Sequence, residues 1–185
     1  ELIKLQRQVG ITFILVTHDQ EEALVMSDRI AVMFEGGIAQ LADPETLYRR
    51  PNSKQVAEFI GTMNFVPATI LSEVGGKVEI EAKGLGKVTL DETQSPPPRG
   101  EEPVIGLRPE TLTLLFPGQT TSDRKVDGLI DEVIYFGDMT YYDVYLGGTD
   151  VEVRLSMRNV PGRPILDVGT RVEVAWSPEA LVLFR

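Results

Sequence analysis

The chain of 185 residues contains no cysteine, and His18 is its single histidine. The lack of cysteine excludes disulfides, thiolate nucleophiles and thiolate metal sites, and it fits a reducing compartment. A zinc site is excluded because no second histidine or cysteine is present to share the metal. No serine lies in a nucleophile-elbow pattern. Few candidates for catalysis therefore remain, and His18 is the first of them.

Positive charge is also scarce in this sequence. It contains 18 Lys and Arg against 28 Asp and Glu, which gives a formal net charge of -10 and a pI of about 4.6. A nucleic-acid-binding protein needs a basic footprint, so we expect no nucleic-acid partner. Attraction to an anionic membrane surface through charge is excluded for the same reason. No apolar run approaches the length of a membrane span, and no signal peptide is visible.

What the sequence does contain is a long apolar run directly before His18. Residues 11–17 are apolar and partly β-branched, which predicts a strand buried on both faces. Asp19 and Glu22 match a capping box, which predicts that a helix begins after His18. His18 would then lie at the end of a parallel strand, where ligands bind in open α/β sheets. A structural role, in which His18 bonds to backbone groups or to Asp19, stays open at this point.

The pattern changes near residue 63, which divides the chain into two predicted domains. Residues 1–62 alternate helix and strand signals, and the first helix lacks an N-cap, so we expect the chain to be part of a longer protein. Residues 63–185 show short alternating segments separated by Gly and Pro, which predict a small β-barrel or sandwich. The predicted strands are 77–81, 86–90, 104–107, 111–115, 126–136, 139–146, 150–157, 171–176 and 181–184. The first domain is predicted to hold helices at 2–9, after Asp43-Pro44 and after Asn52 or Ser53, with a hairpin over 30–41.

Several strings of this sequence resemble one protein family. Residues 16–24, Val-Thr-His-Asp-Gln-Glu-Glu-Ala-Leu, resemble the switch region of ABC transporter ATPases. Further matching strings are 26–33, 37–40, 44–48 and 59–65. Together they resemble the importer subfamily whose ATPase carries a C-terminal β domain called TOBE, and residues 106–110 and 172–179 look like landmarks of that domain. The implied fold is an α+β/β chain: the C-terminal remnant of an α/β ABC ATPase domain in 1–62, followed by an all-β, OB-like TOBE barrel in 63–185.

The resemblance also implies a role for His18. In the family this histidine contacts the γ-phosphate of ATP and helps to order the attacking water. The Gly-rich phosphate loop, the Mg²⁺-binding Asp, the catalytic Glu and the signature motif would all precede Glu1. ATP and Mg²⁺ are therefore expected in the parent protein, and none is expected on this chain, to which no cofactor-binding or metal-binding residue is assigned. We expect the chain alone to be inactive.

The partners implied by the resemblance are those of an import ATPase. They are the transmembrane permease subunits, a second copy of the ATPase and, indirectly, a solute-binding protein. The expected location is the cytoplasmic face of the cell membrane. Residues 61–65 and 137–140 are most similar to spermidine/putrescine importers, with sugar and ferric-iron importers as alternatives. The β domain is expected to regulate and dimerise, and its acidic charge suits a cation better than an oxyanion.

Two readings from other classes stay open. The chain could be a stand-alone β module for dimerisation or small-ligand binding. It could also be an unrelated α+β enzyme that uses His18 as a base, although no triad partner for His18 is apparent.

Overall fold

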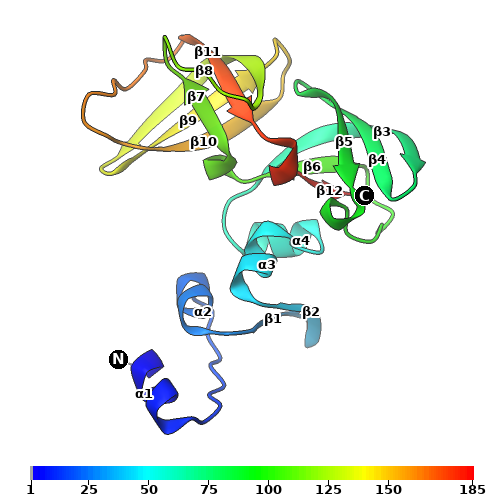
Figure 1. The fold of residues 1–185 in the computed structure, drawn as a ribbon, viewed down its shortest axis with the longest axis vertical. Helices are drawn as coiled ribbons and strands as arrows, with labels where there is room; N and C mark the ends of the chain where they lie inside the picture. The colour runs from blue at the N-terminus through cyan, green and yellow to red at the C-terminus, as the bar shows by residue number, and fades with distance from the viewer. Residues whose placement is uncertain (1) are drawn as a thin grey trace. The chain divides into compact units, whose positions relative to one another are not determined.

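The computed structural model describes residues 2–185, except for the side chains of residues 2, 6 and 7. The chain divides into two compact units, Glu1–Gly61 and Thr62–Arg185. In Figure 1 the first unit runs from blue to cyan and the second from cyan through green and yellow to red. The sequence pattern places the change one residue later, between residues 62 and 63.

The first unit consists of short helices and a single hairpin, as far as the structure describes it. Asp19, Asp43 and Ser53 each accept a hydrogen bond from the backbone N–H three residues further on, and each begins a helix. These helix starts were predicted, with Ser53 rather than Asn52 as the cap of the last helix. The elements are α1 (Leu2–Val9), α2 (Gln20–Met26), β1 (Ile30–Phe34), β2 (Gly37–Ala42), α3 (Pro44–Arg49) and α4 (Lys54–Phe59).

The strand predicted over residues 11–17 is wrong. These residues form no helix or strand, and most of their side chains are exposed. Ile14 and Val16 retain 90% and 92% of their accessible surface. A strand needs a neighbour for its backbone hydrogen bonds, and among residues 2–185 none pairs with this run. An apolar run therefore does not become a buried strand without the strands that would flank it.

A small core holds the first unit together. The aliphatic side chains of this core are buried between the β1–β2 hairpin and the last two helices, and Leu47 and Val56 are fully enclosed. Phe34 meets Phe59 edge to face, with ring centroids 5.5 Å apart. The buried members are Ile30, Val32, Leu47, Val56 and Ile60.

The second unit contains two antiparallel five-stranded sheets. The first has the order β10-β9-β8-β11-β7, and the second has the order β12-β6-β3-β4-β5. The strands of the first sheet are β7 (Leu112–Leu115), β8 (Arg124–Phe136), β9 (Met139–Leu146), β10 (Glu152–Arg158) and β11 (Arg171–Trp176). Those of the second are β3 (Asn64–Val74), β4 (Lys77–Ala82), β5 (Gly86–Asp91), β6 (Val104–Leu107) and β12 (Val182–Phe184).

The predicted small barrel is found only in part. The first sheet curls like a half-barrel in Figure 1, and its two edge strands approach each other, since the Leu114 N–H of β7 lies 3.4 Å from Met157 Sδ of β10. The two edges are not joined by a ladder, so the sheet does not close. The second sheet stays open as well. The unit is thus mostly β, with one curled sheet and one open sheet around a shared core.

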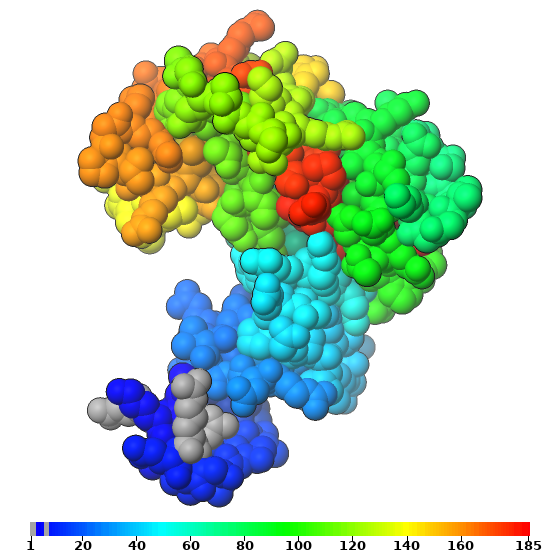
Figure 2. Space-filling model, in the orientation of Figure 1, coloured from blue at the N-terminus to red at the C-terminus, as the bar shows by residue number. Residues whose placement is uncertain are grey.

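That core is extensive. Trp176, Leu155, Leu107 and Ile80 are all at most 1% exposed, and they come from both sheets. Figure 2 shows the C-terminal residues, in red, set between green segments of the same unit, in agreement with the pairing of β12 with β6. No helix in the described part of the chain is long and apolar enough to span a membrane.

Candidate functional site

His18 lies in a bend between the apolar run and α2, and its side chain is exposed. Thr17 Oγ1 accepts a hydrogen bond from the Asp19 N–H at 3.0 Å and donates one to Glu22 Oε2 at 2.9 Å. Asp19 Oδ1 accepts from the Glu22 N–H at 3.0 Å. The predicted capping box is therefore half formed, because the Glu22 carboxylate binds the Thr17 hydroxyl instead of the Asp19 amide.

The contacts of this bend bear on the structural reading of His18, in which the imidazole bonds to backbone groups or to Asp19. The Asp19 carboxylate caps α2 and does not bond to the imidazole. Among the described residues, no hydrogen-bond partner of the imidazole is found. The bend thus has a fixed backbone and presents a free imidazole to solvent, which can donate or accept a hydrogen bond.

Gln20 adds a long-range contact to the same bend. Its side-chain Oε1 accepts a hydrogen bond from the Gly61 N–H at 2.9 Å. Gln20 is the first residue of α2, and Gly61 is the last residue of the first unit. No local sequence pattern indicates this contact, because the two residues lie 41 positions apart.

Groups that could hold Mg²⁺ and a phosphate are not found around His18 among the described residues. Among the residues that the structure describes, no cluster of three or more His, Asp or Glu side chains could hold a metal ion. The sequence has no Gly-rich loop followed by a lysine and a helix. These residues alone therefore do not fit Mg²⁺ with ATP, and no reaction step can be derived from them.

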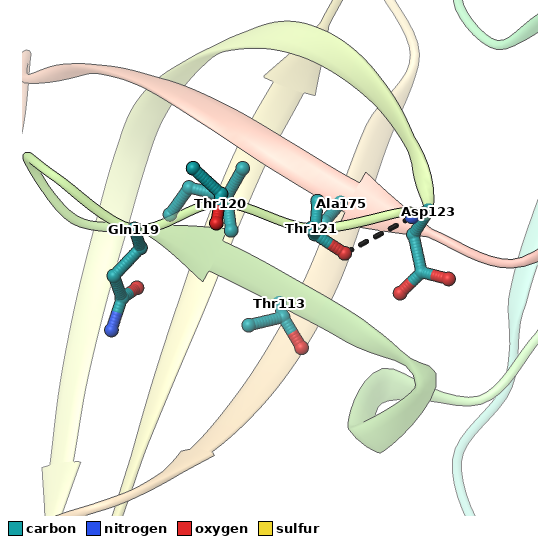
Figure 3. A pocket seen from close by; sticks show the side chains of 7 residues that line it. Thr113, Gln119, Thr120, Thr121, Asp123 and Ala175 are labelled. Atoms are coloured by element: carbon teal, nitrogen blue, oxygen red, sulfur yellow. Dashed lines mark hydrogen bonds between the residues drawn. The ribbon is translucent and has the colours of Figure 1, made fainter.

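A shallow pocket of about 330 Å³ lies in the second unit, beside β7 and β11 (Figure 3). Thr113 comes from β7 and Ala175 from β11, and the loop after β7 supplies the other polar groups. Within that loop Thr121 Oγ1 accepts a hydrogen bond from the Asp123 N–H at 3.0 Å, drawn dashed in Figure 3. The sequence predicted no more than a polar loop here. The lining residues are Thr113, Leu115, Gln119, Thr120, Thr121, Asp123 and Ala175.

An acidic face lies on β8, β9 and β10. Arg154 makes a two-pronged contact with Asp143, with Nε–Oδ1 at 2.7 Å and Nη2–Oδ2 at 2.5 Å, and this contact raises the pKa of the arginine. Burial, followed by the charges of Asp143 and Asp131, raises the pKa of Glu152. The charges of Asp131 and Glu152 raise the pKa of Tyr145. Arg154 thus lies among several carboxylates, so the net charge of this face is negative.

The aromatic residues near positions 135–145 are divided between core and surface. Tyr142 is 2% exposed and packs in the core. Tyr135 and Phe136 are 62% and 69% exposed at the end of β8, where they belong to no core.

One known protein family matches most of the second unit. Residues 105–184 match the TOBE domain. Over this range the chain is similar to that domain. The matched range begins in β6 and ends in β12, so it takes in the whole curled sheet and two strands of the open one.

The chain is also similar over nearly all of its length to proteins named as import ATP-binding proteins. It is 43% identical, over 100% of its length, to the spermidine/putrescine import ATP-binding protein PotA 2 of Pseudomonas aeruginosa. It is 42% identical over 96% of its length to the PotA protein of Rubrobacter xylanophilus, and 35% identical over 97% to that of Nitrosospira multiformis. The chain covers 51%, 46% and 50% of these relatives, and so spans about half of their length.

One further similarity is to a solved structure. The cytoplasmic molybdate-binding protein ModG, with molybdate bound, aligns with a TM-score of 0.48 at 16% identity. The alignment covers 66% of this chain and 94% of that one.

Proposed function

We propose that this chain is the C-terminal part of the ATP-hydrolysing subunit of an ABC importer for polyamines. Residues 1–62 are then the end of the nucleotide-binding domain, and residues 63–185 form the TOBE-type domain, which serves regulation and dimerisation. The observation that carries the proposal is the similarity over the whole chain to a protein named for spermidine/putrescine import and ATP binding, at 43% identity. The TOBE match over residues 105–184 supports the same assignment.

The geometry of the first unit supports the proposal that His18 contacts the γ-phosphate of ATP. The imidazole is exposed and has no bonded partner among the described residues, so it is free to contact a phosphate oxygen supplied from outside the unit. In the intact subunit His18 contacts the γ-phosphate of ATP and helps to order the attacking water. The exposed apolar side chains of residues 11–17 are then covered by neighbouring strands of the nucleotide-binding domain.

The remaining parts of the proposal concern the assembled transporter. The subunit acts with a second copy of itself and with transmembrane permease subunits, at the cytoplasmic face of the membrane. A solute-binding protein selects the polyamine. ATP and Mg²⁺ are held mainly by the rest of the nucleotide-binding domain.

The deciding experiment uses the full-length subunit that contains this chain, assembled with its permease subunits in vesicles. His18→Ala is expected to lower ATP hydrolysis by about 10²-fold, the usual effect of losing a group that stabilises the transition state. Glu21→Gln is the matched control, because Glu21 is also exposed, lies on α2 and has no contact with the bend. Hydrolysis that is unchanged by His18→Ala would overturn the assignment of His18.

The solute is tested in the same vesicles. A binding protein loaded with spermidine is expected to stimulate hydrolysis by the wild-type subunit, and one loaded with maltose is not. Stimulation by maltose or ferric iron alone would replace the polyamine assignment by one of the related importer classes.

The 185-residue chain by itself is expected to neither bind ATP tightly nor hydrolyse it. Titration calorimetry with Mg²⁺-ATP checks this directly. A micromolar dissociation constant would contradict the proposal that the phosphate-binding groups lie in another part of the subunit.

A further inference from the structure

A second pocket lies entirely within the second unit, beside the end of the chain that Figure 1 marks C. It has a volume of about 250 Å³ and is lined by the turn between β3 and β4, by the segment after β5 and by the residue after β12. A water needs about 30 Å³, so the pocket has room for more than a bridging water. Its charged and hydroxyl side chains are Glu73, Lys77, Glu92, Ser95 and Arg185.

Two side-chain atoms of this lining are buried without a partner. Among the residues that the structure describes, Ser95 Oγ and Arg185 Nε form no hydrogen bond. Burying such groups unpaired costs free energy, because both are hydrogen-bonded to water in the unfolded chain. Arg185 Nε can only donate, and Ser95 Oγ donates readily. A group that satisfies both atoms must therefore be an acceptor.

The Nε side of Arg185 is the side on which another arginine of this unit binds a carboxylate. Arg185 contacts Glu73 through Nη1, while its Nε has no partner among the described residues. Arg154 uses Nε and Nη2 together for the two oxygens of Asp143, at 2.7 and 2.5 Å. A carboxylate matches this edge of a guanidinium in its geometry and its charge. Arg185 can therefore bind a second carboxylate without losing its contact with Glu73.

The loop that carries Ser95 is held in place by Gln94. The Gln94 side chain is buried, and its Nε2 donates to the carbonyl oxygens of Pro178 and Leu181 at 2.7 and 3.1 Å. The Ser95 N–H donates to the Glu92 carbonyl at 3.0 Å. The loop is thus fixed to the segment that leads into β12. A preformed site of this kind loses little free energy to ordering when a ligand binds.

The charges of the lining select the class of ligand. Glu73 and Glu92 are balanced by Lys77 and Arg185, so the side chains of the pocket sum to zero. A phosphate with two negative charges would meet the two carboxylates, and a diamine would meet the two cations. A zwitterion suits both signs at once. Because Glu73 is paired with Arg185, Glu92 is the carboxylate that faces an ammonium group.

We propose that this pocket binds a free amino acid, with Arg185 Nε and Ser95 Oγ donating to its carboxylate and Glu92 accepting from its ammonium group. The site goes beyond the proposed function, and it requires neither ATP nor the transported solute. It also lies apart from the acidic face of β8, β9 and β10.

A series of small ligands tests the class on the 185-residue chain. The probes are L-alanine, propionate, which lacks the ammonium group, ethylamine, which lacks the carboxylate, and inorganic phosphate. The amide signals of Gly75, Gly76 and Ser95 are followed by NMR. L-Alanine is expected to shift them with a Kd of about 1 mM, well within what so small a ligand can reach. Propionate should bind about threefold more weakly, because Glu92 is exposed, and ethylamine and phosphate should shift nothing.

Three variants assign the contacts. Arg185→Lys keeps the charge but loses the Nε donor, and Ser95→Ala loses the hydroxyl, so each is expected to weaken L-alanine and propionate alike by about tenfold. Glu92→Gln should weaken L-alanine by about threefold and leave propionate no weaker. Arg158→Lys and Ser122→Ala are the matched controls, because both residues are exposed outside the pocket, and they should change nothing.

Every outcome bears on the proposal. An absence of shifts with L-alanine far above about 1 mM would overturn it and leave water as the occupant. Propionate as tight as L-alanine, or phosphate tighter, would overturn the zwitterion, and unchanged binding in Ser95→Ala would overturn the site. Unchanged amide signals from β8 and β9 show that a variant is folded. If Arg185→Lys unfolds the unit, Ser95→Ala and the ligand series still decide.

Discussion

Similar apolar sequences are exposed and irregular in one unit of this chain and buried in a strand in the other. Residues 11–17 of the first unit lie without regular structure, with Ile14 and Val16 almost fully exposed. Residues 112–115 of the second unit form β7, in which Leu112 and Leu114 are at most 1% exposed. The difference is the neighbour: β7 pairs with β11, whereas nothing described pairs with residues 11–17.

This contrast shows where each unit gets its stability. The second unit buries the facing sides of two sheets, so its core is complete within the unit. In the described part of the first unit the core cluster has five buried aliphatic side chains, and the unit leaves a run of apolar surface that solvent contacts. An apolar patch of this kind marks a surface that another part of a protein covers, in agreement with the proposed function.

The sharpest test of the contrast removes an apolar side chain from each unit. Leu155→Ala, at a site with 0% exposure in the second unit, is expected to lower the free energy of unfolding by about 2–5 kcal/mol. Val16→Ala, at 92% exposure in the first unit, should change it by less than about 0.5 kcal/mol. Urea unfolding checks both, with the fluorescence of Trp176 for the second unit and helical circular dichroism for the first. Equal losses in the free energy of unfolding of the two variants would contradict the proposed difference between the two units.

Packing density gives a second test. A Cβ added at Gly128 of β8 would lie 2.6 Å from Val144 Cγ1, so Gly128→Ala is expected to cost about 1–3 kcal/mol. A Cβ at Gly37 in the hairpin of the first unit would meet nothing closer than the Phe34 carbonyl at 3.6 Å, and Gly37→Ala should cost far less. Val144→Ala should rescue Gly128→Ala in the double variant, which is measured by the same urea unfolding. A lack of rescue would show that the loss has another cause.

The cap of α3 at Asp43 provides a test of local stabilisation in the first unit. Asp43 Oδ1 accepts a hydrogen bond from the Thr46 N–H at 3.0 Å, and Asp43→Ala is expected to lower the free energy of unfolding because this N–H loses its acceptor. The bonds from Thr46 lower the pKa of Asp43, so the carboxylate stabilises the fold at neutral pH, and this contribution is lost as the pH falls through the lowered pKa. Asp43→Asn keeps a capping oxygen but does not titrate, so it should keep most of the stability without the pH dependence. A pH profile of the unfolding midpoint for the three proteins decides the matter.

Features that depend on neighbouring residues in the sequence could be predicted, and features that depend on residues far apart in the sequence could not. The cap and proline at Asp43-Pro44 act within one helical turn, and the helix lies where they predict it. The bounds of β9 and β11 were predicted in full, because alternating residues end at turn-forming glycines or at Pro178. The strand over 11–17 was wrong because a strand depends on neighbours that its own residues do not encode.

Other features depended on distant partners and could not be found. The strand β3 was missed because its alternation fades after Val66 and Pro67 interrupts it. The acidic face arises from the register between strands. It includes a bulge in β8 that brings both Asp131 and Glu132 near Glu152, and no local sequence pattern reveals it. The bond from Gln20 to Gly61 is of the same kind.

The smallest effect is expected on that acidic face. Burial, together with the nearby Asp143 and Asp131, raises the pKa of Glu152, so the folded protein disfavours its charged form. Glu152→Gln should therefore stabilise the protein at neutral pH by a few tenths of a kcal/mol, up to about 0.5 kcal/mol. The wild type binds the proton more readily when folded than when unfolded, so its disadvantage disappears as the pH falls through the raised pKa. Glu102→Gln, on an exposed loop, is the control and should give no such gain. Unfolding midpoints that differ by the same amount at neutral and acidic pH would mean that the effect of Glu152 is not electrostatic.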